Sequence, residues 1–417
     1  MLTALERPHT IQSGPQGRDA RLVSSPWRVP VKNPRFTQSA SARLSRRRVL
    51  QGSAGLAATA ALGTRQVHTT RAQDVTLNWL TWPGHADPSI VGPFEEATGI
   101  KIVAKEYGSG DLGMVEIAQN PGVYDVFTAS MEFMPQYVAA EILQEMDPTE
   151  YAGWSEYLPE FQQDIGYNVD GKFYTVVYSF GFNGLCYRTD QLTEEEVSSY
   201  SILADPKLAG KVGSNDWWGN TMGALSIANG NSPVEGKNPY LLNAEEFASL
   251  QEYMASIRPQ FGGFWEIAGV ISAFANGTIW IQPGGGDWSA QILQDQGHPV
   301  ASAIPAEGGY LWGEAISIVN GTQKQDAAKQ FVDYMLSAEA QARVAIKPSY
   351  SAIAPNAGAW EILQKDEPEW AERLKMNTFD DPNAITPWRE GRIALRVLPE
   401  EQTIEDWQDA WTAFKEA

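Results

Sequence analysis

The regular alternation of strand-like and helix-like segments from residue 75 onward constrains the fold more than any other feature of the sequence. Residues 75–82 alternate between apolar and polar side chains, and residues 100–107 do the same. Between them, residues 88–98 have helical spacing and stop at Gly99. Strands joined through helices in this way form parallel sheets with both faces covered. The sequence therefore predicts an α/β fold.

The same patterns continue along the rest of the chain. Further strands are predicted over residues 124–127, 173–187, 278–282, 301–305 and 315–319. Further helices are predicted over residues 111–119, 135–142, 221–228, 245–257, 270–276, 289–296, 325–336 and 338–345. A chain of 417 residues with this pattern favours two domains.

A basic leader comes before this alternating region. Three arginines at residues 46–48 are followed by an apolar segment of small residues over 52–63, and residues 70–72 offer a small-x-small cleavage site. This order predicts that residues 1–72 are a leader with a twin-arginine signal peptide, so that the folded protein is exported to the periplasm. A basic disordered arm with a chance arginine cluster is the alternative.

The charge of the chain is divided unevenly between the leader and the rest. Residues 1–72 carry 12 Lys and Arg against 2 Asp and Glu, whereas the remaining residues carry 19 against 49, a net charge of −30. Such an acidic surface repels phosphate backbones and anionic lipid, so we expect no nucleic acid as a partner. No apolar run after residue 73 approaches the roughly 20 residues of a membrane-spanning helix. We therefore expect the exported chain to be soluble.

The small number of cysteines and histidines limits the chemistry that is available. Cys186 is the only cysteine, which excludes disulfides and thiolate clusters. After the leader, only His85 and His298 could serve a histidine metal site or histidine-based catalysis. The sequence also lacks the GxxxxGK[ST], HExxH and GxSxG motifs. We expect neither a cofactor nor an enzymatic activity, although chemistry based on carboxylates stays open.

Four segments of the chain form a series with a characteristic order and spacing. They are Asn78-Trp79 with residues 94–101 (FEEATGIK), residues 124–126 with the helix up to Asp147, residues 304–309 (IPAEGG) with Trp312, and residues 326–328 with residues 331–337 (FVDYMLS). The series resembles the periplasmic solute-binding proteins of ABC importers, and within them the spermidine/putrescine-binding branch. The likeness extends over most of residues 74–356.

The resemblance implies a two-lobed periplasmic-binding-protein fold of type II, with the ligand held in the cleft between the lobes. Lobe I would comprise residues 73–180 and 285–336, and lobe II residues 181–284 and 337–417. The resemblance also implies a monomer that releases a small solute to the membrane permease subunits of an ABC importer and their ATPase.

In such a fold the chain crosses between the lobes three times. Crossings are expected near residues 178–184 and 280–286, where glycines can absorb the dihedral changes of lobe closure. The third crossing is expected just after Leu336.

By resemblance, three residues take ligand-binding positions of the polyamine branch. Trp79 would form an aromatic wall, Ser130 would supply a hydroxyl contact, and Asp216 would supply a carboxylate contact to an amine. The chain departs from the branch at Glu132, where an aromatic residue is common, and around residues 284–288, where an aromatic ring is displaced.

The chemistry of the predicted loops also favours a cation, independently of the resemblance. In a doubly wound sheet the strand ends and the loops after them face the ligand crevice. A desolvated ammonium needs a carboxylate partner and gains roughly 0.5 to 2 kcal/mol from an aromatic face. The candidate ligand-binding residues are Trp79, Trp82, Ser130, Glu132, Asp216, Trp217, Asp287, Trp288, Trp312 and Glu314. They predict a small cationic solute that is similar to a polyamine.

Each candidate also has an ordinary structural role to be weighed against ligand binding. A single Trp on a strand can equally well belong to the core. Trp217 and Trp218 are neighbours on an extended segment and point in opposite directions, so at most one faces the ligand. Asp287 and Glu314 could be solvated acids of an acidic protein.

Two other functions stay open from the sequence. Trp platforms and carboxylates also suit a sugar or another small polar solute. An exported carbohydrate-active enzyme would use two carboxylates, for instance Glu132 and Asp216, although the sequence shows no paired-carboxylate signature.

Overall fold

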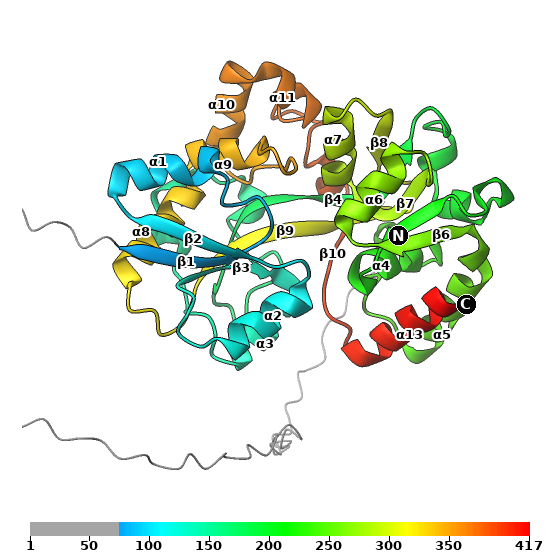
Figure 1. Cartoon of the computed structure of the whole chain (residues 1–417), viewed down its shortest axis with the longest axis horizontal. Helices are drawn as coiled ribbons and strands as arrows, with labels where there is room; N and C mark the ends of the chain where they lie inside the picture. The colour runs from blue at the N-terminus through cyan, green and yellow to red at the C-terminus, as the bar shows by residue number, and fades with distance from the viewer. Residues whose placement is uncertain (1–74) are drawn as a thin grey trace, which may run out of the picture. The chain divides into compact units, whose positions relative to one another are not determined.

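A ten-stranded sheet runs through residues 75–417, which are the residues that the computed structural model describes (Figure 1). Its strands are β1 (Thr76–Thr81), β2 (Lys101–Glu106), β3 (Val126–Ser130), β4 (Val176–Arg188), β5 (Val212–Asn215), β6 (Phe261–Trp265), β7 (Ile281–Gly286), β8 (Val300–Ala303), β9 (Gly309–Ile318) and β10 (Ile393–Leu395). Their order is β2-β1-β3-β9-β4-β7-β5-β6, with β10 beside β9 and β8 beside β4. The predicted signal peptide within residues 1–72 lies outside the described residues.

Helices cover this sheet and confirm the predicted α/β class. The α-helices of residues 75–417 are α1 (Pro88–Thr98), α2 (Gly110–Gln119), α3 (Met134–Ala139), α4 (Trp218–Ala228), α5 (Ala244–Ile257), α6 (Ile267–Ala275), α7 (Asp287–Asp295), α8 (Gln325–Leu336), α9 (Ala338–Ala345), α10 (Ala357–Asp366), α11 (Pro368–Arg373), α12 (Thr386–Arg389) and α13 (Ile404–Glu416). None of the helices in this range is long and apolar enough to cross a membrane.

Local sequence signals explain why α1 begins and ends where the sequence predicts. The Asp87 carboxylate accepts a hydrogen bond from the backbone of Ser89, and Pro88 occupies the first helical position. The helix ends at Gly99, whose φ of 73° is a left-handed conformation that glycine adopts without strain. The bounds of α8 and α9 also match the prediction.

The sheet has two halves, and each half is packed on both faces. In the first half, which we call lobe I, α1, α8 and α9 cover one face of β1–β3, and α2 and α3 cover the other (Figure 1). In the second half, lobe II, one apolar cluster contains side chains of α4, α5 and α13, and another contains side chains of α6 and α7. Each lobe therefore has its own core.

Strands β4 and β9 belong to both lobes. β4 pairs with β9 over Val176–Asn183, and its second half pairs with β7 and β8 as far as Arg188. β9 pairs in turn with β3 from Glu314 to Ile318. These two long antiparallel strands carry the chain between the lobes, and the middle of β4 coincides with the first expected crossing.

The Gly-rich segment that we expected to be the second crossing is a strand inside lobe II. Residues 281–286 form β7, which pairs with β4 and β5. At Gly286 a Cβ atom would come within 2.4 Å of the Phe182 carbonyl oxygen, so the absence of a side chain permits the close approach of β7 to β4. The return between lobes runs along β9 instead.

The segment after Leu336 also differs from the expected lobe boundary, because the chain stays with lobe I there. Ser337 caps α9 immediately after α8, which turns the chain back on the same lobe. Ala342 of α9 and Trp360 of α10 are buried in the lobe I core. Further along, Arg373 of α11 pairs with Asp295 of α7 at 2.7 Å, and Trp407 of α13 packs in the core of lobe II.

Candidate functional site

Six side chains gather where β4 and β9 pair, and we call them the central polar cluster. They are His85 from the loop after β1, Tyr178 and Ser179 from β4, Glu314 from β9, and Lys347 and Tyr350 from the segment after α9. His85, Glu314 and Lys347 are 1%, 5% and 2% exposed. Buried ionisable groups at this density are typical of functional sites.

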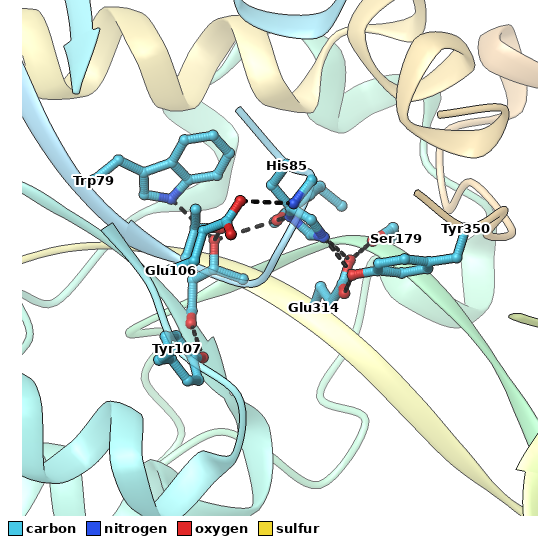
Figure 2. Close-up of polar contacts among 11 residues, drawn as sticks. Trp79, His85, Glu106, Tyr107, Ser179, Glu314 and Tyr350 are labelled. Carbon is cyan, nitrogen blue, oxygen red and sulfur yellow. Dashed lines mark hydrogen bonds and ion pairs between the residues drawn. The ribbon is translucent and has the colours of Figure 1, made fainter. Parts of the chain in front are cut away.

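Glu314 lies at the centre of this cluster (Figure 2). Its Oε2 accepts a hydrogen bond of 2.5 Å from the Ser179 hydroxyl and lies 2.9 Å from His85 Nε2, while its Oε1 accepts a hydrogen bond from the Tyr350 hydroxyl. Burial works to raise the pKa of Glu314, but His85, Lys347 and the bond from Ser179 outweigh it and lower the pKa to about 2. Glu314 is therefore a carboxylate at neutral pH.

A chain of hydrogen bonds ties His85 to the core of lobe I. His85 Nδ1 bonds the Tyr178 hydroxyl, which lies 3.2 Å from Thr128 Oγ1, and that oxygen accepts from Trp79 Nε1 at 3.0 Å. Trp79 itself is 0% exposed and packs edge-on against Phe331. The expected aromatic wall is thus a core residue in this structure, and it positions the site from behind. Burial lowers the pKa of His85, against the influence of Glu314.

Asp287 and Trp312 adjoin the central polar cluster. Asp287 is the first residue of α7, and its Oδ1 accepts from Trp312 Nε1 at 3.1 Å and from the backbone of Trp288 at 2.8 Å. Burial raises the pKa of Asp287 to about 6 despite these bonds. The Trp312 ring meets the Tyr350 ring edge to face, with centroids 6.1 Å apart. A second carboxylate and a second aromatic face therefore lie beside Glu314.

Lys347 places a cation among these groups. Its Nζ lies 3.7 Å from the centroid of the Tyr350 ring, and it has no hydrogen-bond partner among the described residues. Burial lowers the pKa of Lys347 to about 8, although the charges of Glu314 and Asp287 oppose the shift. Lys347 is therefore an ammonium at pH 7.

A second group of residues, which we call the Arg396 cluster, contains Glu132, Trp217, Asn220 and Arg396. Arg396 Nε lies 3.1 Å from Glu132 Oε1, and its Nη1 donates to Asn220 Oδ1 at 2.9 Å. The guanidinium also lies over the Trp217 ring, 4.7 Å from the centroid. Glu132 follows β3 in lobe I, whereas Trp217 and Asn220 lie at the start of α4 in lobe II. Arg396 therefore connects the lobes.

The remaining predicted residues are divided between these regions. Ser130 is paired in register with Glu314 across β3 and β9, and its hydroxyl is buried. Trp82 lies against the Tyr107 ring with centroids 4.6 Å apart, and Trp288 Nε1 donates to Asn183 Oδ1 at 3.1 Å.

Asp216 has partners of a different kind. Its exposed side chain accepts from Trp411 Nε1 at 3.0 Å and from Lys415 Nζ at 2.6 Å, both on α13. Partial burial works to raise the pKa of Asp216, but these two groups outweigh it and lower the pKa. Asp216 thus lies against the C-terminal helix, and its partners are not members of the central polar cluster.

Sequence reasoning missed five of the six members of the central polar cluster, which are His85, Tyr178, Ser179, Lys347 and Tyr350. His85 follows the first strand by a few residues, and this position at a strand end was a usable signal. Lys347 and Tyr350 lie in an irregular segment after α9, where no periodic pattern indicates which way a side chain points. Their role depends on the return of that segment to β9.

Comparison with known proteins gives a consistent family match. The family described as bacterial extracellular solute-binding protein matches residues 89–377. The putrescine/agmatine-binding protein of Pseudomonas aeruginosa is 21% identical over 298 residues, which cover 68% of this chain and 79% of that protein. The putrescine-binding periplasmic protein PotF of Escherichia coli is 23% identical over 302 residues, which cover 67% of this chain and 78% of that protein.

Solved structures agree on the fold. A putative spermidine/putrescine ABC transporter protein from Listeria monocytogenes superimposes with a TM-score of 0.68 at 20% identity, covering 82% of this chain and 98% of that one. The predicted two-lobed fold is therefore confirmed. At this identity the likeness establishes the shared fold, and the ligand has to be inferred from the site.

Proposed function

Because the chain belongs to the bacterial extracellular solute-binding proteins, we propose that it captures a small organic amine for import. This family consists of non-enzymatic solute-binding proteins of ABC importers that act outside the cytoplasm, and the similar PotF is named a periplasmic protein. This family membership removes the alternative of a carbohydrate-active enzyme. Relatives that are named for putrescine and agmatine make an amine the first solute to test.

The position of the Lys347 ammonium carries the proposal. It lies on the face of Tyr350, near the ionised Glu314, in a region that also contains Trp312. A place that accommodates one primary ammonium has the chemistry to hold another, since each aromatic face contributes roughly 0.5 to 2 kcal/mol and the carboxylate adds Coulomb attraction. A neutral sugar gains no comparable attraction from the ionised carboxylate.

The burial of the site implies that the lobes separate before a solute enters. Glu314 and Lys347 are almost fully buried, with 5% and 2% of their surface exposed. We propose that the solute enters when the lobes open about β4 and β9, and that its contacts with both lobes favour closure.

A ligand panel tests this function. The purified protein is titrated with putrescine, agmatine, spermidine, quaternary amines and neutral sugars, while its Trp fluorescence and melting temperature are followed. We expect saturable stabilisation by at least one amine, and weaker binding of that amine by a Trp312→Leu variant. Trp370→Leu, on the outer helix α11, is the matched control. A response to neutral sugars alone would refute the amine and leave the fold unaffected.

We also propose that the protein acts as a monomer and reaches the periplasm by the twin-arginine route. The three arginines at residues 46–48 and the apolar segment over residues 52–63 support this route. Replacing residues 46–48 by lysines should keep the protein in the cytoplasm, as cell fractionation would show. Continued export of that variant would contradict the proposed route, and light scattering would detect a dimer.

A further inference from the structure

Several lysines in the described part of the chain form ion pairs with a carboxylate, whereas Lys347 does not. Lys324, for example, bonds Asp125 at 2.8 Å, and Lys415 bonds Asp216 at 2.6 Å. Lys347 is 2% exposed, and no described residue accepts a hydrogen bond from its Nζ. A buried ammonium with three donors and no acceptor destabilises the protein, so this group needs an acceptor.

The nearby carboxylates already accept hydrogen bonds from other donors. Both oxygens of Glu314 have donors in Ser179, His85 and Tyr350. The Oδ1 atom of Asp287 receives the bonds of Trp312 and of the Trp288 backbone. These carboxylates attract Lys347 through space without bonding to it, and a molecule that binds beside Lys347 can supply the acceptor that it lacks.

The charges of the site also limit what that molecule can be. Glu314 and Asp287 supply negative charge, and the positive charge of Lys347 neutralises part of it. A diamine would place two ammonium groups in a buried space that holds a third, and like charges repel strongly where water is excluded. A molecule with one ammonium group and one oxygen acceptor would add a single positive charge near the carboxylates and would supply the acceptor that Lys347 lacks.

We propose that the solute is a monoamine that carries an oxygen acceptor, a hydroxyl or a carboxylate, to which Lys347 donates, and that Lys347 discriminates against diamines. This inference rests on the proposed capture of an organic amine and makes its ligand class narrower. Lys347 is then a specificity-determining residue, because it takes the place that a second ammonium group would need.

A series of ligands with the same carbon chain tests the inference. Putrescine, 4-aminobutanol and 4-aminobutanoate differ only at one end, where they carry an ammonium, a hydroxyl and a carboxylate. Calorimetry at pH 7 would give the affinity of each for the unmodified protein, for Lys347→Met and for the control Lys365→Met, whose lysine is 82% exposed. The hydroxyl and carboxylate members also distinguish the two kinds of acceptor.

We expect the unmodified protein to bind an oxygen-bearing member more tightly than putrescine, by about tenfold or more, since hydrogen bonds to charged groups are strong. Lys347→Met should shift the affinity ratio toward putrescine by about the same factor, and Lys365→Met should leave it unchanged. A preference for putrescine that Lys347→Met does not alter would overturn the inference, while amine capture would stand. If neither this series nor the amine panel bound, amine capture itself would fail.

A measurement on the unmodified protein keeps the test valid if Lys347→Met does not fold. In protein with ¹⁵N-labelled lysines, the Lys347 ammonium signal should move when the oxygen-bearing amine saturates the site. An unchanged Lys347 signal at saturation would overturn the inference.

Discussion

The central polar cluster and the Arg396 cluster are made of similar groups but differ in how their cation is held. Each combines a buried carboxylate, a buried cation and an aromatic ring, which are Glu314, Lys347 and Tyr350 in one and Glu132, Arg396 and Trp217 in the other. Arg396 is bonded to a carboxylate and to an amide, whereas Lys347 is bonded to neither.

We propose that this difference separates a structural contact from a binding site. The planar guanidinium of Arg396 has partners in both lobes and stacks on Trp217. The Lys347 ammonium lacks an acceptor in a region with similar electrostatics. We interpret the Arg396 cluster as a brace that closes the lobes and the central polar cluster as the place where the solute completes the bonding.

Removing the brace should have the largest effect. Arg396→Met leaves the Glu132 carboxylate, which is 6% exposed, without its partner, and we expect the free energy of unfolding to fall by about 3–5 kcal/mol. Urea denaturation followed by Trp fluorescence would measure it. The double variant with Glu132→Gln should recover part of the loss, because no unpaired charge stays buried. Equal losses in the single and double variants would show that the ion pair is not the cause.

Removing the central carboxylate should act on binding. Glu314→Gln is expected to raise the Kd for the amine roughly 100-fold, because the substitution removes the negative charge of the buried carboxylate that we propose attracts the ammonium group of the solute. Asp216→Asn is the matched control and should change the Kd less than about fivefold, since exposed ion pairs contribute at most about 1 kcal/mol. Calorimetry would compare the two. A larger effect of Asp216→Asn would place the cation beside α13 instead.

Crowding the point where β4 passes the site should have a smaller effect. A Cβ atom on Gly181 would lie 2.6 Å from Asp287 Oδ2 and 2.6 Å from the Trp312 ring. Gly181→Ala is therefore expected to lower the free energy of unfolding by about 1–3 kcal/mol and to weaken amine binding. Gly92→Ala is the control, because nothing lies within 4 Å of its added Cβ and it should stabilise α1 by roughly 0.5–1 kcal/mol. Equal melting temperatures of the two variants would contradict the predicted crowding.

The smallest expected effect concerns the pH dependence of stability. The folded-state pKa of Asp287 is raised from 3.8 to about 6, so the folded protein holds this proton after the unfolded chain has lost it. The contribution of Asp287 to stability should therefore fall as the pH rises from about 4 to about 6. Asp287→Asn should remove this decline and be more stable than the unmodified protein at pH 7. Parallel pH profiles of the two proteins would refute the shift.

The pKa of Glu314 is shifted in the opposite direction, so its contribution to stability changes with pH in the opposite sense. Its folded-state pKa is lowered to about 2, so its contribution is fully present above about pH 4.5 and is lost as the pH falls toward 2. Glu314→Gln should remove this acid-side loss, while Asp287→Asn should not.

The fold was predictable from sequence where short-range signals determine structure. Asp87, Pro88 and Gly99 define both ends of α1, and the bounds of α8 and α9 follow from apolar spacing and a serine cap. The strand over residues 281–286 was not predictable in the same way, because its proline and glycines are typical of loops. It pairs with β4 only because its missing side chains let the two backbones approach.

Of the central polar cluster, the sequence indicated only Glu314, together with the adjoining Asp287 and Trp312, and it did not indicate their contacts. Trp312 and Glu314 were expected at the cleft, and they lie beside Tyr350 and Lys347 where β4 and β9 pair. Trp79 was expected to form a wall, but its indole is fully buried.

The sequence by itself determined the α/β class, most helix bounds and the presence of carboxylates and Trp residues near strand ends, because each depends on neighbours within a few positions. Tertiary structure alone decided which of those carboxylates already have a partner. Glu132 is separated by 264 residues from Arg396, and Asp216 by 199 residues from Lys415. Ion pairing over such separations depends on where β10 and α13 pack, and the same folding leaves Lys347 among charges but without an acceptor.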